Sequence, residues 1–211
     1  MGPFKNKMSI RKLYNLILCL LLCSCGGGKY TYLFDAGKQL DFSEGKWLLN
    51  RTESNSKVFD SELYEASYAG FKEILGDGLV DMNTIRTTKL LAPKIGFELT
   101  PEELGKLQQD SDCDYLINVR GNVVSNGAGS LAFDSGNGYY SASNQSSVSI
   151  MIYDLNAKTV ISSSQVVGKA TAENSHFDNG NGVPSINSSA ETLMVSGAKK
   201  LIGQYEKNRL D

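Results

Sequence analysis

Residues 148–167, VSIMIYDLNAKTVISSSQVV, decide the fold. β-Branched and other apolar residues alternate or cluster on both sides of a short polar segment, a pattern typical of two strands joined by a turn. The segment Leu155-Asn156-Ala157-Lys158 supplies the turn. The stretch therefore predicts a β-hairpin with strands at 148–154 and 159–167.

Three helices are predicted around this hairpin. In residues 60–76 apolar side chains recur every three or four positions, Asp60 or Ser61 can cap the start, and glycines end the pattern. The second helix begins at Thr100-Pro101-Glu102-Glu103, a capping box with proline at the first helical position. The third begins at the capping box Ser188-Ser189-Ala190-Glu191 and carries the apolar stripe Leu193, Met194, Gly197, Leu201 and Tyr205.

Short apolar runs before and between these helices predict further strands at 30–34, 46–50, 79–82 and 114–121. From residue 46 onward the order is β-α-β-α-β-β-β-α. Strands that alternate with helices and then form a hairpin predict an α/β or α+β fold, with a single mixed sheet and about three helices. The length suits one domain, which we expect to span residues 46–211.

Two polar segments interrupt this pattern. Residues 121–147 are rich in Gly, Ser and Asn, which predicts a long loop or a ragged hairpin, and residues 173–187 predict a second polar loop. Tyr139, Tyr140 and Phe177 are aromatic residues within these otherwise polar segments. Because exposed aromatic side chains often anchor interfaces, we expect these three as candidate partner contacts, although core or disordered aromatic residues are an equal alternative.

The first 24 residues have the three parts of a signal peptide. Four basic residues (Lys5, Lys7, Arg11 and Lys12) precede an apolar run at 13–22. That run is half of the roughly 20 residues that span a bilayer, and it matches a signal-peptide core. Residues 1–24 are therefore predicted to be removed on export.

The run ends in Leu22-Cys23-Ser24-Cys25, which matches the lipobox of bacterial lipoproteins. Cys25 is expected to receive fatty acyl chains such as palmitate, and cleavage before it leaves only small residues next to the cut. Cleavage before Cys23 would place the bulky Leu22 there, so Cys25 is the better nucleophile. An ordinary secretory cleavage with incidental cysteines is the alternative. Residues 25–45 are predicted to be a lipidated tether.

The residues after Cys25 bear on the destination. Gly26-Gly27-Gly28-Lys29 has no aspartate at the position that retains many lipoproteins in the inner membrane, and no acidic cluster. By resemblance to such sorting signals, the expected location is the periplasmic face of the outer membrane.

Composition and motifs point away from several function classes. The predicted mature chain has 17 basic and 23 acidic residues, a net charge of −6 that argues against nucleic acid as a partner. The single histidine, His176, lies in a polar segment without a nucleophile motif, and with Cys113 it makes a poor zinc set. Cys113 lies among carboxylates, which raise a thiol pKa. We therefore expect no enzyme activity, no metal and no cofactor.

Three segments resemble one group of envelope lipoprotein domains. The strand after a helix at 112–121 (DCDYLINVRG), the hairpin at 150–160 (IMIYDLNAKTV) and the closing amphipathic helix are similar to those of the curli-secretion lipoprotein, the lipoprotein activators of penicillin-binding proteins and the N-terminal domain of the Tol-Pal translocation protein. The resemblance follows element order over most of residues 46–207. It implies the fold far more than an activity.

The resulting hypothesis is a membrane-anchored periplasmic lipoprotein that acts as a non-enzymatic binding or assembly factor in the cell envelope. Its expected partners are the membrane, through lipid on Cys25, and an envelope protein. The alternative is an envelope lipoprotein that binds a small ligand or glycan.

Overall fold

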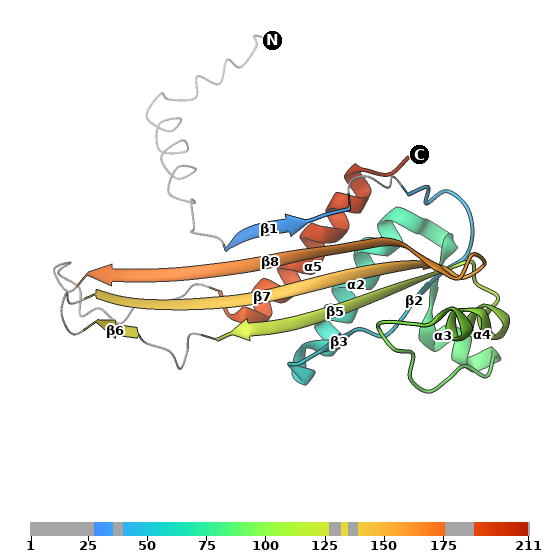
Figure 1. The fold of residues 1–211 in the computed structure, drawn as a ribbon, viewed down its shortest axis with the longest axis horizontal. Helices are drawn as coiled ribbons and strands as arrows, with labels where there is room; N and C mark the ends of the chain where they lie inside the picture. The colour runs from blue at the N-terminus through green and yellow to red at the C-terminus, as the bar shows by residue number, and fades with distance from the viewer. Residues whose placement is uncertain (1–27, 36–39, 127–131, 135–138, 176–187, 211) are drawn as a thin grey trace, which may run out of the picture.

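The computed structural model describes residues 28–35, 40–126, 132–134, 139–175 and 188–210. They form one mixed eight-stranded sheet and four α-helices, an α+β fold (Figure 1). The strands are β1 (Lys29–Leu33), β2 (Trp47–Leu49), β3 (Glu53–Ser54), β4 (Leu79–Asp81), β5 (Tyr115–Ser125), β6 (Ala132–Asp134), β7 (Tyr139–Asp154) and β8 (Thr159–Ser175). The helices are α2 (Asp60–Leu75), α3 (Met82–Thr88), α4 (Pro101–Ser111) and α5 (Ala190–Lys207), with 3-10 turns at Lys57–Phe59 and Gly76–Gly78.

The sheet has an antiparallel half and a parallel half. Its order is β1-β8-β7-β5-β2-β4, with β3 beside β5 and β6 beside β7. Strands β1, β8, β7 and β5 are antiparallel neighbours, whereas β5, β2 and β4 run parallel. The predicted mixed sheet and the order of its main elements are confirmed.

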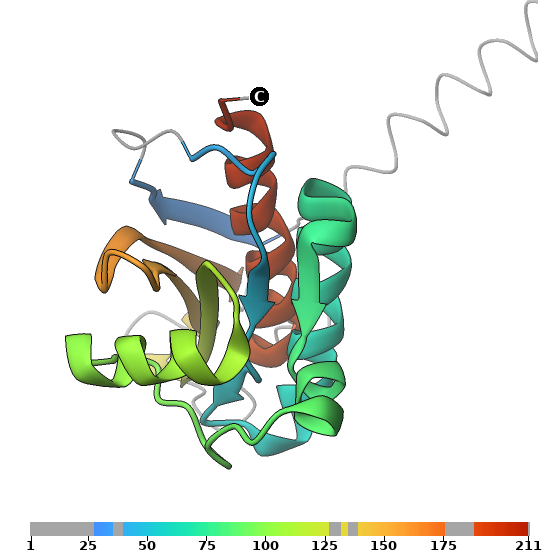
Figure 2. The ribbon, with the colours of Figure 1, turned by 90° about the vertical axis from the view of Figure 1, so that its right-hand side faces the viewer.

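Two core layers lie on opposite faces of the sheet because alternate strand residues point to opposite sides. On one face, α2 and α5 pack over Trp47, Leu49, Ile117 and Ile150. On the other face, α3 and α4 pack over strand residues that alternate with those of the first layer, including Leu48, Leu116 and Tyr153. Figure 2 shows α2 and α5 together on one side and α4 on the other. The predicted stripe of α5 is buried as expected.

The strands run further than the apolar pattern predicts. β7 begins at Tyr139 rather than 148, β8 continues to Ser175, and β5 reaches Ser125. The expected loop at 121–147 was therefore wrong over much of its length, and the hairpin alternative was nearer. The extension carries Ser, Gln and Ala, which fit a sheet when neighbouring strands supply the pairing.

The helix starts follow the predicted capping chemistry in one case and depart from it in two. Thr100 and Glu103 form the reciprocal capping box of α4. At α5 the cap is Ser189, which accepts from the Thr192 amide, so the box predicted from Ser188 was one residue early. At α2 no side chain caps the helix, and Asp60 instead accepts from the Ser54 hydroxyl.

One helix was not anticipated, whereas the strand predicted at 30–34 is present as β1. Met82, expected at a strand end, begins the short helix α3. Within the predicted tether 25–45, residues 29–33 pair with β8 and Phe42 joins the core. None of the helices among the described residues combines the length and apolarity that crossing a bilayer requires.

Candidate functional site

One candidate site lies where the parallel strands β2 and β4 end. After β2 the chain forms α2 on one face of the sheet, and after β4 it forms α3 and α4 on the other face. Where the connections from two adjacent strands leave toward opposite faces of the sheet, a crevice opens outside the carboxyl ends of the strands. Ligands commonly bind α/β sheets at this place.

A cavity of about 420 Å³ occupies this position. Its volume lies within the range of roughly 300–1,000 Å³ that is usual for small-molecule sites. Polar side chains dominate its lining, which consists of Arg51, Thr52, Asp60, Ser61, Tyr64, Glu65 and Asn83. We call these residues the crevice.

Hydrogen bonds hold the crevice together across three chain segments. The Arg51 Nη2 donates to Asn83 Oδ1 at 2.8 Å, which joins the end of β2 to the start of α3. The Thr52 hydroxyl donates to the Asp60 carbonyl at 2.8 Å, which joins the same strand end to the first turn of α2. Both donors and acceptors therefore stand in fixed positions around the cavity.

Tyr64 and Asp81 form the deepest polar contact beside the crevice. The Tyr64 hydroxyl donates to Asp81 Oδ1. Burial, and next the hydrogen bond to Asp81, raise the pKa of Tyr64 well above its usual value. The phenol therefore stays protonated at neutral pH, so Tyr64 acts as a hydrogen-bond donor and not as a base.

Tyr64→Phe is expected to lower stability by about 1 kcal/mol at pH 8, because a hydrogen bond to a carboxylate is lost. Since the folded-state pKa of Tyr64 is raised, its contribution is fully present below the unfolded value of about 10 and is lost as pH rises beyond it. The variant should therefore lose less stability than wild type between pH 9 and pH 11 in urea unfolding.

Tyr68→Phe, one turn further along α2, is the matched control for loss of a hydroxyl. A stability–pH slope that is identical in wild type and Tyr64→Phe would contradict the assignment.

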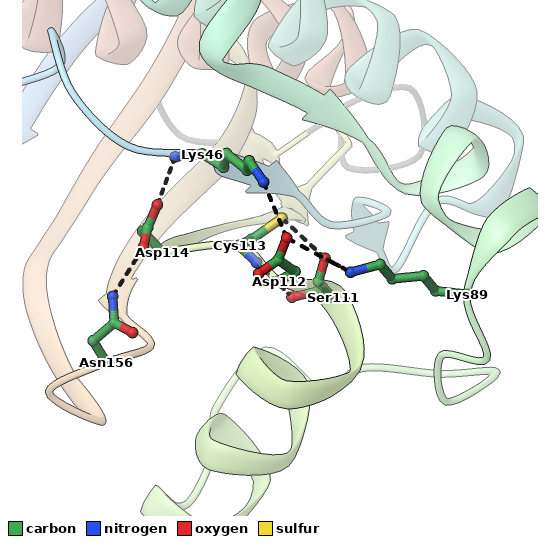
Figure 3. A network of polar contacts seen from close by, with 7 residues as sticks. All are labelled: Lys46, Lys89, Ser111, Asp112, Cys113, Asp114 and Asn156. Carbon is green, nitrogen blue, oxygen red and sulfur yellow. Dashed lines mark hydrogen bonds and ion pairs between the residues drawn. The ribbon is translucent and has the colours of Figure 1, made fainter.

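A second polar network joins α4, β2 and the β7–β8 turn (Figure 3). The Lys46 ammonium lies 3.0 Å from Asp112 Oδ2, and Lys89 donates to the Ser111 carbonyl at 3.0 Å. The Lys46 amide and the Asn156 side chain both donate to the carboxylate of Asp114. The Asp112 and Lys46 side chains are largely exposed, so this network positions the chain and contributes little to stability.

Cys113 lies beneath that network, and it is buried with 2% of its surface exposed. Desolvation is the main reason that its pKa is raised, while Lys46 and Lys89 act in the opposite direction. The expected direction is thus confirmed, but burial and not the neighbouring carboxylates is the main cause. A buried thiol of this kind is a poor nucleophile.

Thiol labelling of the mature Cys25→Ser protein should be slow at pH 8 because Cys113 is then the one remaining thiol and is buried. Labelling should become fast in urea, where the thiol is exposed. Stoichiometric reaction of the folded protein within the mixing time would contradict the assignment.

A broad polar surface lies on the antiparallel half of the sheet, on the face opposite α2 and α5. Figure 1 shows α5 behind β8 and β7, with α4 at the far right of the view, and Figure 2 shows α4 on the side opposite α5. Among the described residues no helix covers the rest of this face. We call it the open face; its residues are Lys29, Thr31, Leu33, Asn122, Ser143, Gln145, Ser147, Ser149, Ser163, Gln165, Val167, Lys169 and Thr171.

The open face is rich in hydroxyl and amide groups. Cross-strand neighbours such as Ser149 and Gln165 are directly opposite each other, and the Gln165 amide donates to the Ser149 hydroxyl at 3.3 Å. Leu33, with 66% of its surface exposed, adds an apolar side chain at the β1 edge. Backbone pairing fixes these groups, so the surface is preorganised for contact with another molecule.

The predicted site residues fall at the margins of the described structure. Cys25, Phe177 and His176 lie outside the described residues. Tyr139 and Tyr140 begin β7, opposite Ser175 and Asn174 of β8. The structure does not bring them to the crevice, and their role in partner contact stays a prediction.

The crevice was not found from the sequence. Arg51 and Asn83 each follow a short apolar strand closely, and that position is the signal that could have flagged them. Among the described residues, no three His, Cys, Asp or Glu side chains gather in a way that could hold a metal ion.

Comparison with known proteins gives likenesses of shape only. No protein-family model and no curated protein sequence matches the chain. The PelC dodecamer structure from Paraburkholderia phytofirmans has a TM-score of 0.47 and 10% identity, covering 87% of this chain and 100% of that chain. The hypothetical protein CT253 from Chlamydia trachomatis has a TM-score of 0.39 and 13% identity, covering 79% and 98%.

The lipoprotein GNA1162 from Neisseria meningitidis has a TM-score of 0.34 and 13% identity, covering 76% of this chain and 99% of that chain. The solved structures similar to this chain thus include a bacterial lipoprotein. With TM-scores below 0.5, these likenesses transfer no activity, partner or assembly to this protein.

Proposed function

We propose that this protein is a bacterial envelope lipoprotein that acts as a non-enzymatic binding or assembly factor. Lipid on Cys25 would hold it at the periplasmic face of the outer membrane, consistent with the lipobox and with the residues that follow it. The observation that carries the binding role is the open face, a wide polar surface of the sheet that no described helix covers.

The open face suits an envelope protein as partner because its hydroxyl and amide groups are fixed by strand pairing and offer many hydrogen bonds. The exposed Leu33 and the half-buried Val167 add apolar area on the same face. A protein interface of ordinary size combines such apolar contacts with about one hydrogen bond per 100–200 Å².

Photo-crosslinking in the bacterial cell tests this role. A photoreactive amino acid at Ser147, in the middle of the open face, should give a discrete adduct with an envelope protein. The matched position is Glu73, which is exposed on α2 on the other side of the molecule. Adducts that are missing at Ser147, or the same at both positions, would contradict the proposal.

The crevice supports a second candidate, the binding of a small polar ligand such as a glycan. A cavity of about 420 Å³ with fixed donors from Arg51 and acceptors from Asp60 and Glu65 suits a ligand with many hydroxyl groups. Glycan-array binding that Arg51→Ala abolishes and Lys106→Ala preserves would support this candidate. Equal binding by both variants would reject it.

A further inference from the structure

We propose that the domain lies tilted on the membrane, with one end of the sheet, and not the opposite end, against the lipid headgroups. This end, which we call the tip, consists of residues 139–144 of β7 and residues 170–175 of β8. The inference rests on the proposed lipidation of Cys25, and it adds which surface of the protein meets the bilayer.

Strand register places the anchored end of the chain next to the tip. β1 is antiparallel to β8, and Lys29 is opposite Lys169 while Leu33 is opposite Gln165. The chain therefore enters the sheet at Lys29 and runs away from the tip. Figure 1 shows β8 and β7 continuing well past the start of β1.

Chain length limits how far Lys29 can lie from the membrane. Four peptide units separate Cys25 from Lys29, and they span at most about 14 Å. From Lys169 to Ser175, β8 extends about 20 Å beyond this point at 3.3 Å per residue. Because this overhang is longer than the tether, the tip must rest on the headgroups while the strands tilt away from the membrane normal.

The opposite orientation fails on the same lengths. With the tip pointing away from the membrane, the part of β8 from Lys169 back to Thr159 would stand between Lys29 and the bilayer. That part measures about 33 Å, more than twice the reach of the tether.

The positive charge at Lys29, where the chain enters the sheet, suits contact with an anionic surface. Lys29 and Lys169 are exposed and directly opposite each other, and neither forms an ion pair with a described carboxylate. Like charges at such a position destabilise a strand pair unless a counter-charge lies nearby. Lipid phosphates would supply it, because Lys29 lies only four residues from the proposed lipidation site.

Headgroup quenching measures the orientation. The full lipidated protein, in a Cys113→Ala background, is placed in phosphatidylcholine–phosphatidylglycerol vesicles that carry headgroup nitroxides. A fluorophore on Thr171→Cys, near the tip, should be quenched. The same fluorophore on Ala157→Cys, in the β7–β8 turn at the other end, should not be quenched. Both positions are exposed, and they lie toward opposite ends of the β7–β8 hairpin.

Two variants test the reasons for the orientation. A Gly/Ser spacer of about 20 residues inserted after Gly27 adds roughly 25 Å of reach and should abolish the quenching at position 171. Lys29→Gln combined with Lys169→Gln should weaken it, whereas Lys94→Gln combined with Lys106→Gln, away from the tip, should not.

Flotation of the protein with the vesicles tests the lipid anchor separately from the orientation. Protein that fails to float lacks the anchor, and both the proposed location and the orientation with the tip at the membrane are then wrong. Protein that floats with equal quenching at positions 157 and 171, or with stronger quenching at 157, leaves the anchor in place and overturns the orientation alone.

Discussion

Cys25→Ser is expected to move the whole protein from the membrane fraction to the soluble fraction and to abolish incorporation of a palmitate analogue. The variant lacks the thiol to which lipid is proposed to attach. One acyl chain supports only reversible binding, with an association constant of about 10⁴ M⁻¹, whereas two or more chains hold a protein stably. Fractionation and in-gel detection of the analogue measure both effects.

Cys23→Ser is the matched control for this prediction because Cys23 lies two residues before Cys25 in the same lipobox. Serine keeps a small side chain there, so lipidation and membrane association should be unchanged. Loss of the label in Cys23→Ser with retention in Cys25→Ser would show that the assigned nucleophile is wrong.

Trp47→Ala should destabilise the fold by about 3–5 kcal/mol, the usual cost of truncating a large core side chain. Trp47 is 1% exposed on β2, stacks on Tyr115 with 4.1 Å between ring centroids, and donates from Nε1 to the Glu44 carbonyl at 2.9 Å. Truncation therefore creates a cavity and removes a hydrogen bond. The measurement is the urea-unfolding midpoint in the Cys25→Ser background.

Leu90→Ala serves as the reference for that measurement because Leu90 is 96% exposed. Its effect should lie within about 0.5 kcal/mol of zero. A loss of similar size in both variants would argue that Trp47 does not belong to the core.

Elements with a strong apolar period could be predicted from the sequence, whereas those without it could not. α2, α4 and α5 repeat apolar residues at helical spacing, and each lies close to its expected range. α3 has only Met82 and Ile85 as buried residues, so its sequence MNTIRTT carries almost no periodic signal. Its position depends on tertiary packing more than on local preference.

The extensions of β7 and β8 lacked a signal for a different reason. Residues 143–147 have the sequence SNQSS. Its odd-numbered residues lie on the open face and its even-numbered residues lie on the face toward α5, so both faces carry small or polar side chains. With no apolar face, strict alternation disappears, and composition alone predicts a loop. Long-range pairing between the two strands decides the structure, and a local reading of either strand cannot detect that pairing.

The crevice could be predicted only in part. The polar residues that follow each apolar run are visible in the sequence, but their meeting depends on strand order. β2 lies between β5 and β4, although β5 follows β4 along the chain. Arg51 and Asn83 come together only because β2 and β4 are parallel neighbours.

The pairing of β1 with β8 also sets an order for folding during synthesis. Lys29 is made 140 residues before its partner Lys169, and chains emerge from the ribosome N-terminus first. The contact closes a very long loop, so β1 joins a sheet whose other strands can already have assembled. Until then β1 is unpaired chain, which would leave the proposed lipidation site at Cys25 open to a modifying enzyme, and the incorporation of β1 would then fix the proposed anchor to the finished domain.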